Sequence, residues 1–139
     1  MNLKLQFASL VVGALAVSTL NAPVHPIVHP VVHKPIKLII RSSWYCDGFE
    51  GHLTANGEKY DCDMLTVAHK DYPLGTKLIL RNPENDHEVL VRVNDRGPYV
   101  DGRGLDCSRR VAELLGFEDK GVALLELTVV KFGNNHYSR

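Results

Sequence analysis

Short segments of alternating apolar and polar residues recur along the chain, and a period of two indicates β-strands with one buried face. The clearest segment is residues 88–94, in which Val89, Val91 and Val93 fall on one face. Other apolar segments, bounded by turn-forming residues, predict further strands. They cover residues 36–45, 65–69, 76–81 and 122–132. The fold is therefore predicted to be mainly β.

One segment has the helical period instead. Val111, Leu114 and Leu115 lie at positions i, i+3 and i+4, so they share one helical face. Ser108 is suited to the N-cap because its hydroxyl can accept a hydrogen bond from a free backbone amide, and Gly116 is suited to end the helix. A single short helix among about five strands favours a β-barrel with a helical crossover connection.

A faint internal repeat suggests that the barrel has two related halves. Two sets of matching positions stand 45 residues apart, namely Gly57 with Gly102 and Asp61-Cys62 with Asp106-Cys107. If a pseudo-twofold axis relates the halves, Cys62 and Cys107 are equivalent and approach each other near the axis. We therefore expect a Cys62–Cys107 disulfide with Cys46 free. The alternative is three reduced, buried thiols.

The N-terminal residues 1–22 are typical of a signal peptide. Lys4 supplies the positive charge, an apolar run follows over residues 10–20, and cleavage after Ser18 or Ala22 fits the small-residue rule. An uncleaved membrane anchor is the alternative, but the apolar run is short for a bilayer. We expect export to the periplasm or secretion, with no stable membrane anchor. No cysteine lies at either cleavage site, so a lipoprotein is not expected.

Residues 23–37 form a second N-terminal segment, rich in proline and histidine. The prolines block a helix, so an extended linker is expected. His25, His29 and His33 recur every four residues, and a metal-binding tract is the alternative interpretation. We favour the linker and expect no metal or other cofactor. The barrel domain is then predicted over residues 38–133, with a C-terminal tail over 134–139.

Composition narrows the range of partners. The 139 residues suffice for one ordinary domain, and Lys+Arg and Asp+Glu each number 16, which gives a net charge of zero. This balance argues against a nucleic-acid binder that depends on phosphate electrostatics. We expect a monomer.

Four places in the barrel carry residues able to do chemistry. Glu58 follows an Asn-Gly turn, and His69 ends an apolar strand. Asp95 lies in an Asn-Asp-Arg-Gly-Pro block directly after the alternating strand, and Asp106 and Ser108 precede the helix. Each has a structural alternative: Glu58 in a solvated turn, His69 in the core, Asp95 capping its own turn, and Asp106 and Ser108 capping the helix.

Together these segments resemble the rare lipoprotein A family. The matching segments are residues 43–45, 51–61, 65–69, 74–76, 91–99 and 105–108, which span most of the domain. The strongest signal is the Thr-Ala-Asn-Gly-Glu block (residues 54–58) followed at this distance by the Asn-Asp-Arg-Gly-Pro block (94–98). The resemblance implies a six-stranded double-psi β-barrel with one or two short helices, like the first domain of expansins.

The resemblance also implies an activity. Family members are lytic transglycosylases, which cleave the β-1,4 bond between N-acetylmuramic acid and N-acetylglucosamine without water and leave 1,6-anhydro ends. Here the substrate would be peptidoglycan glycan strands freed of their stem peptides. By this likeness Asp95 is the acid/base and Glu58 and His69 are the other active-site positions. Thr54 and Asp106 match positions that contact glycan in expansin-type barrels, with Tyr99 and Ser108 as further candidate substrate contacts.

Two other functions stay open at this stage. The first is a non-catalytic, expansin-like module that binds glycan through the same groove. The second is a secreted inhibitor that binds a protein partner. No family-type repeat domain follows the last predicted strand, so the barrel is expected to find glycan through its own groove or alongside other cell-wall enzymes. Trp44, Tyr45, Tyr60 and Tyr99 could stack on sugars in either glycan-directed function.

Overall fold

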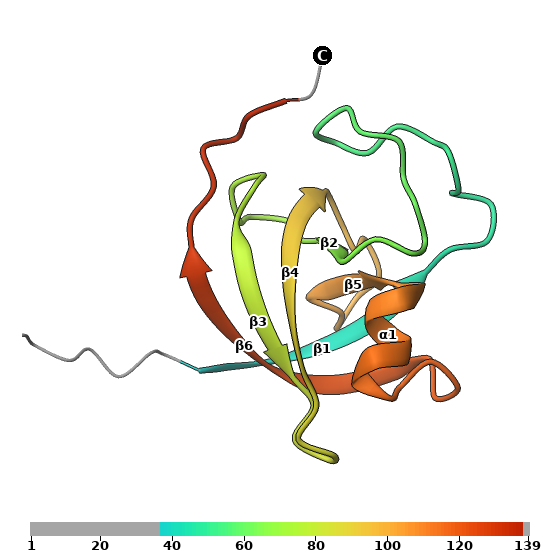
Figure 1. Cartoon of the computed structure of the whole chain (residues 1–139), viewed down its shortest axis with the longest axis vertical. Helices are drawn as coiled ribbons and strands as arrows, with labels where there is room; N and C mark the ends of the chain where they lie inside the picture. The colour runs from blue at the N-terminus through green and yellow to red at the C-terminus, as the bar shows by residue number, and fades with distance from the viewer. Residues whose placement is uncertain (1–36, 138–139) are drawn as a thin grey trace, which may run out of the picture. The chain divides into compact units, whose positions relative to one another are not determined.

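Six strands close into a barrel in the order β1-β5-β2-β4-β3-β6, with one short helix packed against it (Figure 1). The structure is a computed structural model that describes residues 37–137. The elements are β1 (Leu38–Tyr45), β2 (Thr66–Ala68), β3 (Lys77–Arg81), β4 (Glu88–Asp95), β5 (Leu105–Ser108), α1 (Arg109–Leu115) and β6 (Val122–Lys131). The predicted signal peptide and nearly all of the predicted linker lie outside the described residues. Within residues 37–137, no helix has the length and apolarity needed to cross a bilayer.

The strand pairing repeats in the two halves of the chain. β1 pairs in parallel with β5 and antiparallel with β6, while β4 pairs in parallel with β2 and antiparallel with β3. β1, β2 and β3 thus correspond to β4, β5 and β6. The pseudo-twofold relation predicted from the internal repeat is confirmed at the level of topology.

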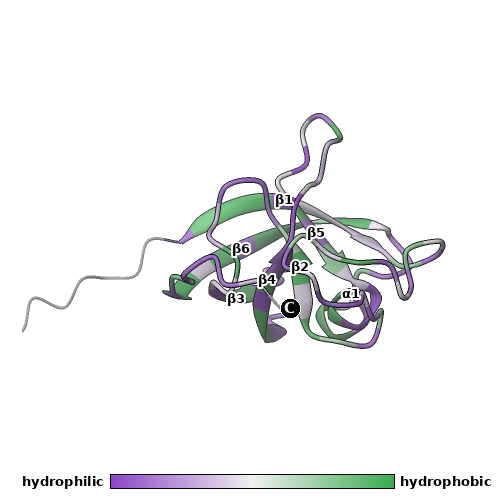
Figure 2. Ribbon diagram, turned by 90° about the horizontal axis from the view of Figure 1, so that it is seen from above, coloured by the Kyte–Doolittle hydropathy of each residue, from purple (hydrophilic) through white to green (hydrophobic). Residues whose placement is uncertain are grey.

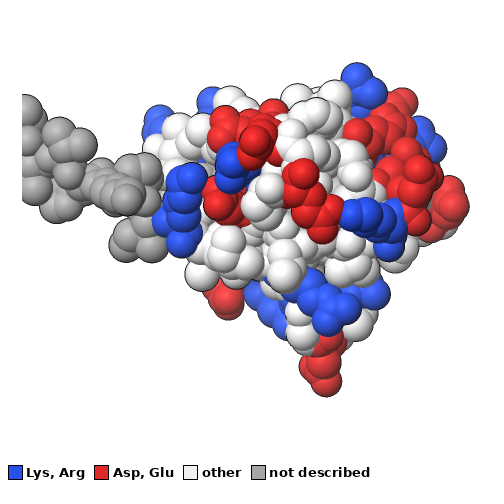
Figure 3. All heavy atoms as spheres, turned by 90° about the horizontal axis from the view of Figure 1, so that it is seen from below, with Lys and Arg blue, Asp and Glu red and all other residues white. Residues whose placement is uncertain are grey.

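The core fills the barrel with the apolar faces of alternating strands. Val89, Val91 and Val93 are all buried, as their period of two predicts. Leu78 and Leu80 of β3 are fully buried beside them, and further core residues come from β6 and α1. Apolar residues follow the strands, whereas the connecting loops are mostly hydrophilic (Figure 2). Figure 2 views the molecule from above. Seen from below, its surface carries both acidic and basic side chains (Figure 3).

The helix begins and ends where the sequence predicts. The Ser108 hydroxyl accepts a hydrogen bond from the Val111 amide at 3.4 Å, and Gly116 adopts the left-handed conformation (φ 72°) that commonly ends helices. An added Cβ at Gly116 would also lie 2.6 Å from the Asn85 side chain. Val111, Ala112 and Leu115 form the buried face.

Strand β5 was not predicted as a strand. It has only four residues, two of them polar, and its last residue is also the helix N-cap. Its alternation nevertheless separates two rows of residues that cross the sheet. The polar row consists of Ser43, Asp106, Ala68 and Asp95, which are register partners on β1, β5, β2 and β4. The apolar row beside it consists of Trp44, Cys107, Val67 and Val93. On β1, β5 and β2 the two rows are separated because neighbouring residues of a strand point to opposite faces. On β4 the register shift between Val67 and Ala68 separates them, since it pairs Ala68 with Asp95, two residues beyond Val93.

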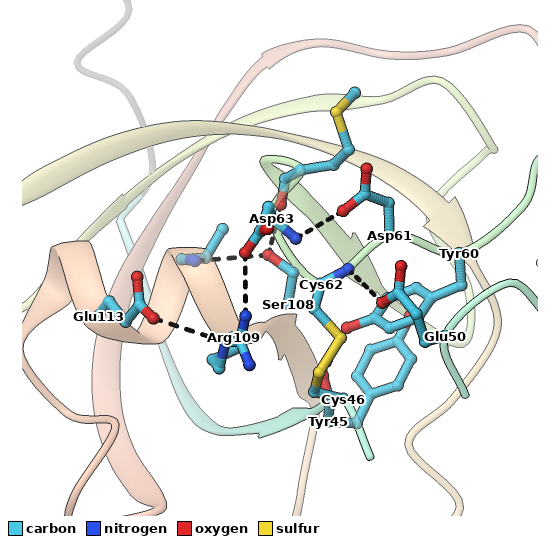
Figure 4. Close-up of a disulfide and its surroundings, with 12 residues drawn as sticks. Tyr45, Cys46, Glu50, Tyr60, Asp61, Cys62, Asp63, Ser108, Arg109 and Glu113 are labelled. Atoms are coloured by element: carbon cyan, nitrogen blue, oxygen red, sulfur yellow. Dashed lines mark hydrogen bonds and ion pairs between the residues drawn. A yellow bond between two sulfur atoms is a disulfide. The ribbon is translucent and has the colours of Figure 1, made fainter. Parts of the chain in front are cut away.

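The predicted Cys62–Cys107 disulfide is wrong. Cys46 and Cys62 are joined instead, with their Cα atoms 5.4 Å apart (Figure 4). Cys107 is free and fully buried. The error has a structural cause. Cys107 lies on β5, paired with Trp44 and Val67, whereas Cys62 lies in the loop before β2, so the 45-residue spacing did not relate equivalent positions. Cys107 points into the barrel, whereas Cys62 lies in a loop outside it.

The segment after β6 folds back onto the barrel. The Asn135 amide donates to the Leu74 carbonyl at 3.1 Å, and the Leu74 amide donates to the Asn135 side chain at 2.8 Å. Part of the predicted tail therefore fixes the loop that precedes β3.

Candidate functional site

A groove of about 370 Å³ lies over the polar row. Ala68, Asp95 and Asp106 of that row line it, together with residues of the loop between β4 and β5 and of the segment after β1. Its volume is within the range of small-molecule pockets. Ala68 lies between the two acids in the register. Its side chain is a single methyl group, so it takes up little space between the two carboxylates. The backbones of Asp95 and Asp106 are two strand spacings apart, roughly 10 Å.

Asp95 is the acid with the most hydrogen-bond donors in this groove. Its Oδ1 accepts from the Ala55 amide at 2.9 Å and from the Arg96 amide at 2.8 Å. Its Oδ2 accepts from the Tyr45 hydroxyl at 3.2 Å. Donors on both oxygens fix the orientation of the carboxylate and stabilise negative charge on it.

The Tyr45 side chain is held by other aromatic rings. It stacks on Tyr60, with centroids 4.4 Å apart, and meets Phe49 edge to face at 5.5 Å. The Tyr60 hydroxyl donates to the Tyr45 carbonyl at 2.5 Å. Burial raises the pKa of Tyr45 far above its ordinary value, and the Asp95 charge adds to this. The phenol therefore stays protonated and donates to Asp95.

The loop that supplies the Ala55 amide is fastened to β4 through Glu58. Both carboxylate oxygens of Glu58 accept from the Arg92 guanidinium, at 2.9 and 2.8 Å, and Asn94 donates to it at 3.2 Å. The hydrogen bonds from Arg92 lower the pKa of Glu58 to about 2. Glu58 lines a different hollow from Asp95. The structure therefore does not bring Glu58 into the groove with Asp95.

His69 lies beside Asp95 along the backbone but turns its ring elsewhere. Its Nδ1 accepts from the Asp71 and Tyr72 amides at 3.1 and 3.0 Å, and its ring stacks on Tyr72. Burial lowers the pKa of His69, which favours the neutral ring that can accept these bonds. The His69 amide donates to the Asp95 carbonyl at 3.2 Å. His69 is not among the residues that line the groove.

Arg96, which follows Asp95, is directed to the same turn. Its guanidinium donates to the His69 carbonyl at 3.2 Å and to the Tyr72 carbonyl at 2.9 Å. A longer bond of 3.4 Å reaches the Asn135 side chain. These acceptors hold its charge on the loop, not on the Asp95 carboxylate.

The second acid of the groove, Asp106, has a different partner. The buried Ser43 hydroxyl donates to Asp106 Oδ1, and the Arg103 guanidinium donates to the same Ser43 oxygen at 3.3 Å. Two exposed aromatic rings form the rim: Tyr99 is 81% exposed and Phe49 is 52% exposed. Such exposure leaves their faces open to a ligand.

Two predicted substrate contacts do not reach the groove. Ser108 is fully buried, where it caps α1 and donates to the Met64 carbonyl, so its assignment as a substrate contact is corrected to helix capping. Thr54 is also buried, with its hydroxyl 2.7 Å from Asn56 Oδ1 and 3.1 Å from the Glu58 carbonyl. Neither residue lines the groove, and both support its surroundings through these hydrogen bonds.

Sequence reasoning missed Phe49 and Arg103 as groove residues, and Ser43 as the residue that bonds to both Asp106 and Arg103. For Phe49 a signal was present, because a large apolar residue inside a Gly-rich segment (residues 48–51) is not a core position. For Ser43 and Arg103 the signal is tertiary, since they meet only through the β1–β5 register.

One group of possible metal ligands occurs among the described residues. Ligand atoms of Cys46, Glu50 and Cys62 lie within 4.8 Å of one another. Both sulfur atoms are joined in the disulfide, so they are not available as thiolate ligands.

Comparison with known proteins places this barrel in a family. A family model described as lytic transglycolase matches residues 39–127, which include all of the groove residues named above. The chain belongs to the lytic transglycolase family. The resemblance noted in the sequence is thereby confirmed.

Curated relatives share the same part of the chain. The endolytic peptidoglycan transglycosylase RlpA of Campylobacter jejuni is 43% identical over 95 residues, covering 68% of this chain and 34% of the relative. RlpA of Vibrio cholerae is 42% identical over 90 residues, covering 65% and 34%. The probable RlpA of Synechocystis is 42% identical over 90 residues, covering 65% and 28%. The chain thus spans about a third of the length of these lytic transglycolase relatives.

Solved structures with the same fold are more distant in sequence. The Streptomyces papain inhibitor has a TM-score of 0.57 at 21% identity, covering 69% of this chain and 96% of its own. A variant of the Clavibacter michiganensis expansin in complex with cellohexaose has a TM-score of 0.56 at 19% identity, covering 69% and 51%. These likenesses show the fold alone, and they confirm the predicted double-psi β-barrel of the lytic transglycolase family.

Proposed function

We propose that this protein is an exported lytic transglycosylase that cleaves the glycan strands of peptidoglycan at the groove over the polar row. Membership of the family supports the class of reaction. The observation that carries the proposal is the placement of Asp95 in the groove, with both carboxylate oxygens held by donors and a second acid, Asp106, on the same row. The expected products are 1,6-anhydro-muramoyl ends.

The proposed chemistry needs one proton to move twice. The glycosidic oxygen between muramic acid and glucosamine takes a proton from Asp95 as the C1–O bond breaks. The C6 hydroxyl of the same muramic acid then attacks C1 and returns its proton to Asp95. Protons balance without water, so one carboxyl group serves as acid and then as base. The Tyr45 hydroxyl and the Ala55 and Arg96 amides stabilise the carboxylate that exists between the two transfers.

Asp106 has a separate role in this scheme. Positive charge develops at C1 and the ring oxygen as the bond breaks, and a carboxylate across the groove stabilises that charge. The small side chain of Ala68 leaves room for a sugar ring between the two acids. The exposed rings of Phe49 and Tyr99 provide stacking surfaces for the neighbouring sugars.

Glu58, His69 and Thr54 act in this proposal as positioning residues. Glu58 is occupied by Arg92 and holds the loop that presents the Ala55 amide to Asp95. His69 organises the turn that binds the Arg96 guanidinium. Neither side chain lines the groove, so we assign neither a proton transfer.

The proposal is tested by comparing the native protein with Asp95→Asn, which keeps the shape of the side chain and removes its acid. Both are incubated with glycan strands whose stem peptides have been removed by amidase, and soluble saccharides and bound protein are measured. The native protein should release saccharides, and the variant should bind the strands but release about a thousandfold less. Equal release by both would reject Asp95 as the acid/base.

A non-catalytic glycan-binding module is the alternative outcome. In that case both proteins bind the strands with similar affinity and neither releases saccharides. Asp95 would then be a groove contact only.

A further inference from the structure

The loop between β4 and β5 carries two arginines that line the groove, Arg96 and Arg103, and its backbone is held in place at Arg103. The Arg103 amide donates to the Val100 carbonyl at 3.2 Å, which closes a turn, and the next amide, of Gly104, donates to the Arg41 carbonyl of β1 at 2.9 Å. Gly104 packs so tightly that an added Cβ would lie 2.6 Å from the Ile40 side chain. The backbone that carries Arg103 is therefore anchored to the barrel.

The two arginines of the groove differ in how their charge is used. Arg96 has backbone carbonyls of His69 and Tyr72 as acceptors. Arg103 has one long hydrogen bond, to Ser43 Oγ at 3.3 Å, and forms no ion pair with any acid of residues 37–137. A guanidinium carries several N–H donors in a rigid fork, so most donors of Arg103 have no acceptor among residues 37–137. Among the residues lining the groove, Arg103 is the cation available to a ligand.

The chemistry that suits such a group is a single carboxylate. A planar guanidinium binds a carboxylate through two parallel hydrogen bonds. Asp106 lies close by, since both side chains contact Ser43, and it would repel a ligand that carried a larger negative charge. A neutral sugar that carries one carboxylate on a short substituent suits both Arg103, which binds the carboxylate, and Asp106, which disfavours further negative charge.

We propose that Arg103 is a specificity-determining residue that binds the lactyl carboxylate of muramic acid. The inference rests on the proposed peptidoglycan substrate and deepens it. The lactyl group carries a free, charged carboxylate only where no stem peptide is attached, because the peptide converts it to an amide. Arg103 therefore makes the groove prefer glycan strands with free lactyl groups, and the amide lacks the charge that the guanidinium recognises.

The test uses two forms of one substrate. Peptide-free strands are divided, and in one half the lactyl carboxylates are converted to methylamides, which mimic the bond to a stem peptide. Binding of both forms is measured for the native protein, Arg103→Gln and Arg103→Lys. Arg41→Gln is the matched control, because it removes the same charge from an exposed position of β1 outside the groove.

The native protein should bind the carboxylate form about tenfold or more tightly than the amide form, as expected for a charge-assisted contact. Arg103→Gln should lose this preference by weaker binding of the carboxylate form alone. Arg103→Lys, which keeps the charge, should retain part of it, and Arg41→Gln should retain all of it. The inference is overturned if the native protein has no preference, or if Arg103→Gln weakens binding of both forms equally.

Cleavage, measured in parallel, separates the inference from the proposed function. Saccharide release without a preference for the carboxylate form would reject the role of Arg103 and leave the activity standing. A preference that Arg103→Gln abolishes, without saccharide release, would reject the activity and support Arg103 as the carboxylate contact.

Discussion

The barrel and the loop that joins β1 to β2 are held together by different forces. The barrel has a continuous apolar core that draws on every strand and on α1. The loop, here called the stapled loop and defined as residues 46–62, buries only Cys46, Tyr60 and Cys62 of its own apolar side chains. It depends on the disulfide and on a few polar contacts such as Glu58–Arg92. The barrel thus provides stability, whereas the stapled loop provides the geometry around Asp95.

The difference predicts that damage to the two regions has different consequences. A core substitution should lower the free energy of unfolding of the whole domain without changing the groove. A substitution in the stapled loop should disturb the donors to Asp95. These are the Ala55 amide in the loop and the hydroxyl of Tyr45, which directly precedes Cys46 of the disulfide. The predictions below separate these effects.

The largest loss of stability is expected in the barrel core. Phe117, two residues after the end of α1, is 1% exposed, and its truncation leaves a cavity. Phe117→Ala should lower the free energy of unfolding by about 3–5 kcal/mol, measured by urea titration. Saccharide release per folded molecule should stay close to native well below the melting temperature. A large drop in release with unchanged stability would contradict the division of roles.

The second largest effect is expected from the disulfide. It closes a loop with a sequence separation of 16, and such a cross-link contributes about 3 kcal/mol by restricting the unfolded chain. Its sulfur atoms lie beside the Tyr45–Tyr60 stack and the Glu50 side chain, which accepts from the Cys62 amide at 2.9 Å (Figure 4). Replacing Cys46 and Cys62 together by Ser should lower activity by about tenfold to a hundredfold, since the donors to Asp95 lose their fixed positions.

Hydrogen exchange can locate that effect. In the double Ser variant, amides of residues 49–60 should lose protection while β3 and β4 keep theirs. Cys107→Ala is the control, because it removes the third sulfur from the barrel core and leaves the stapled loop intact. Equal loss of protection in the barrel strands would show that the loop and the barrel unfold as one unit.

A smaller effect, dependent on pH, is expected at Glu58. Its pKa is lowered to about 2 by Arg92, so its stabilising contact is complete above its ordinary pKa of 4.5 and is lost as pH falls toward 2. Glu58→Gln should lower the free energy of unfolding by about 1.5 kcal/mol near neutral pH, a modest loss because the Glu58–Arg92 pair is partly exposed. Urea titrations of both proteins should show that the difference between their free energies of unfolding becomes smaller as the pH is lowered. A gap that stays constant with pH would contradict the ionic contact.

The smallest effect on stability is expected at the rim. Phe49 is 52% exposed, so Phe49→Ala should change the free energy of unfolding by less than about 0.5 kcal/mol. It should weaken glycan binding several-fold, by roughly 1 kcal/mol, because a stacking surface is lost. Leu124→Ala, which truncates an exposed side chain on β6 away from the groove, is the control. Similar glycan affinity in both variants would remove Phe49 from the site.

The same contrast explains which parts of the structure the sequence predicts. Periodicity locates most of the barrel, because strands such as β4 need one continuous apolar face. It misses β5, whose alternation of Leu105 and Cys107 with Asp106 is too short to stand out. It also gives the wrong disulfide, since spacing along the chain does not reveal that Cys107 points into the barrel.

The candidate site divides in a similar way. Asp95 and Asp106 can be selected from the sequence because their motifs are local, and the register then places both on one row. The contacts that define their surroundings come from residues distant in sequence, as in the Tyr45–Asp95 and Arg103–Ser43 bonds. Glu58 is selected by its motif too, but only the structure shows that its carboxylate is occupied by Arg92.

The central claim is that the groove around Asp95 breaks glycan strands without water. The most direct measurement is a digest of peptide-free strands by the native protein in heavy-oxygen water, with the new ends analysed by mass spectrometry. The account predicts 1,6-anhydro-muramoyl ends that carry no heavy oxygen, because the C6 hydroxyl of the sugar is the nucleophile. New reducing ends that carry heavy oxygen would identify a hydrolase and contradict the account.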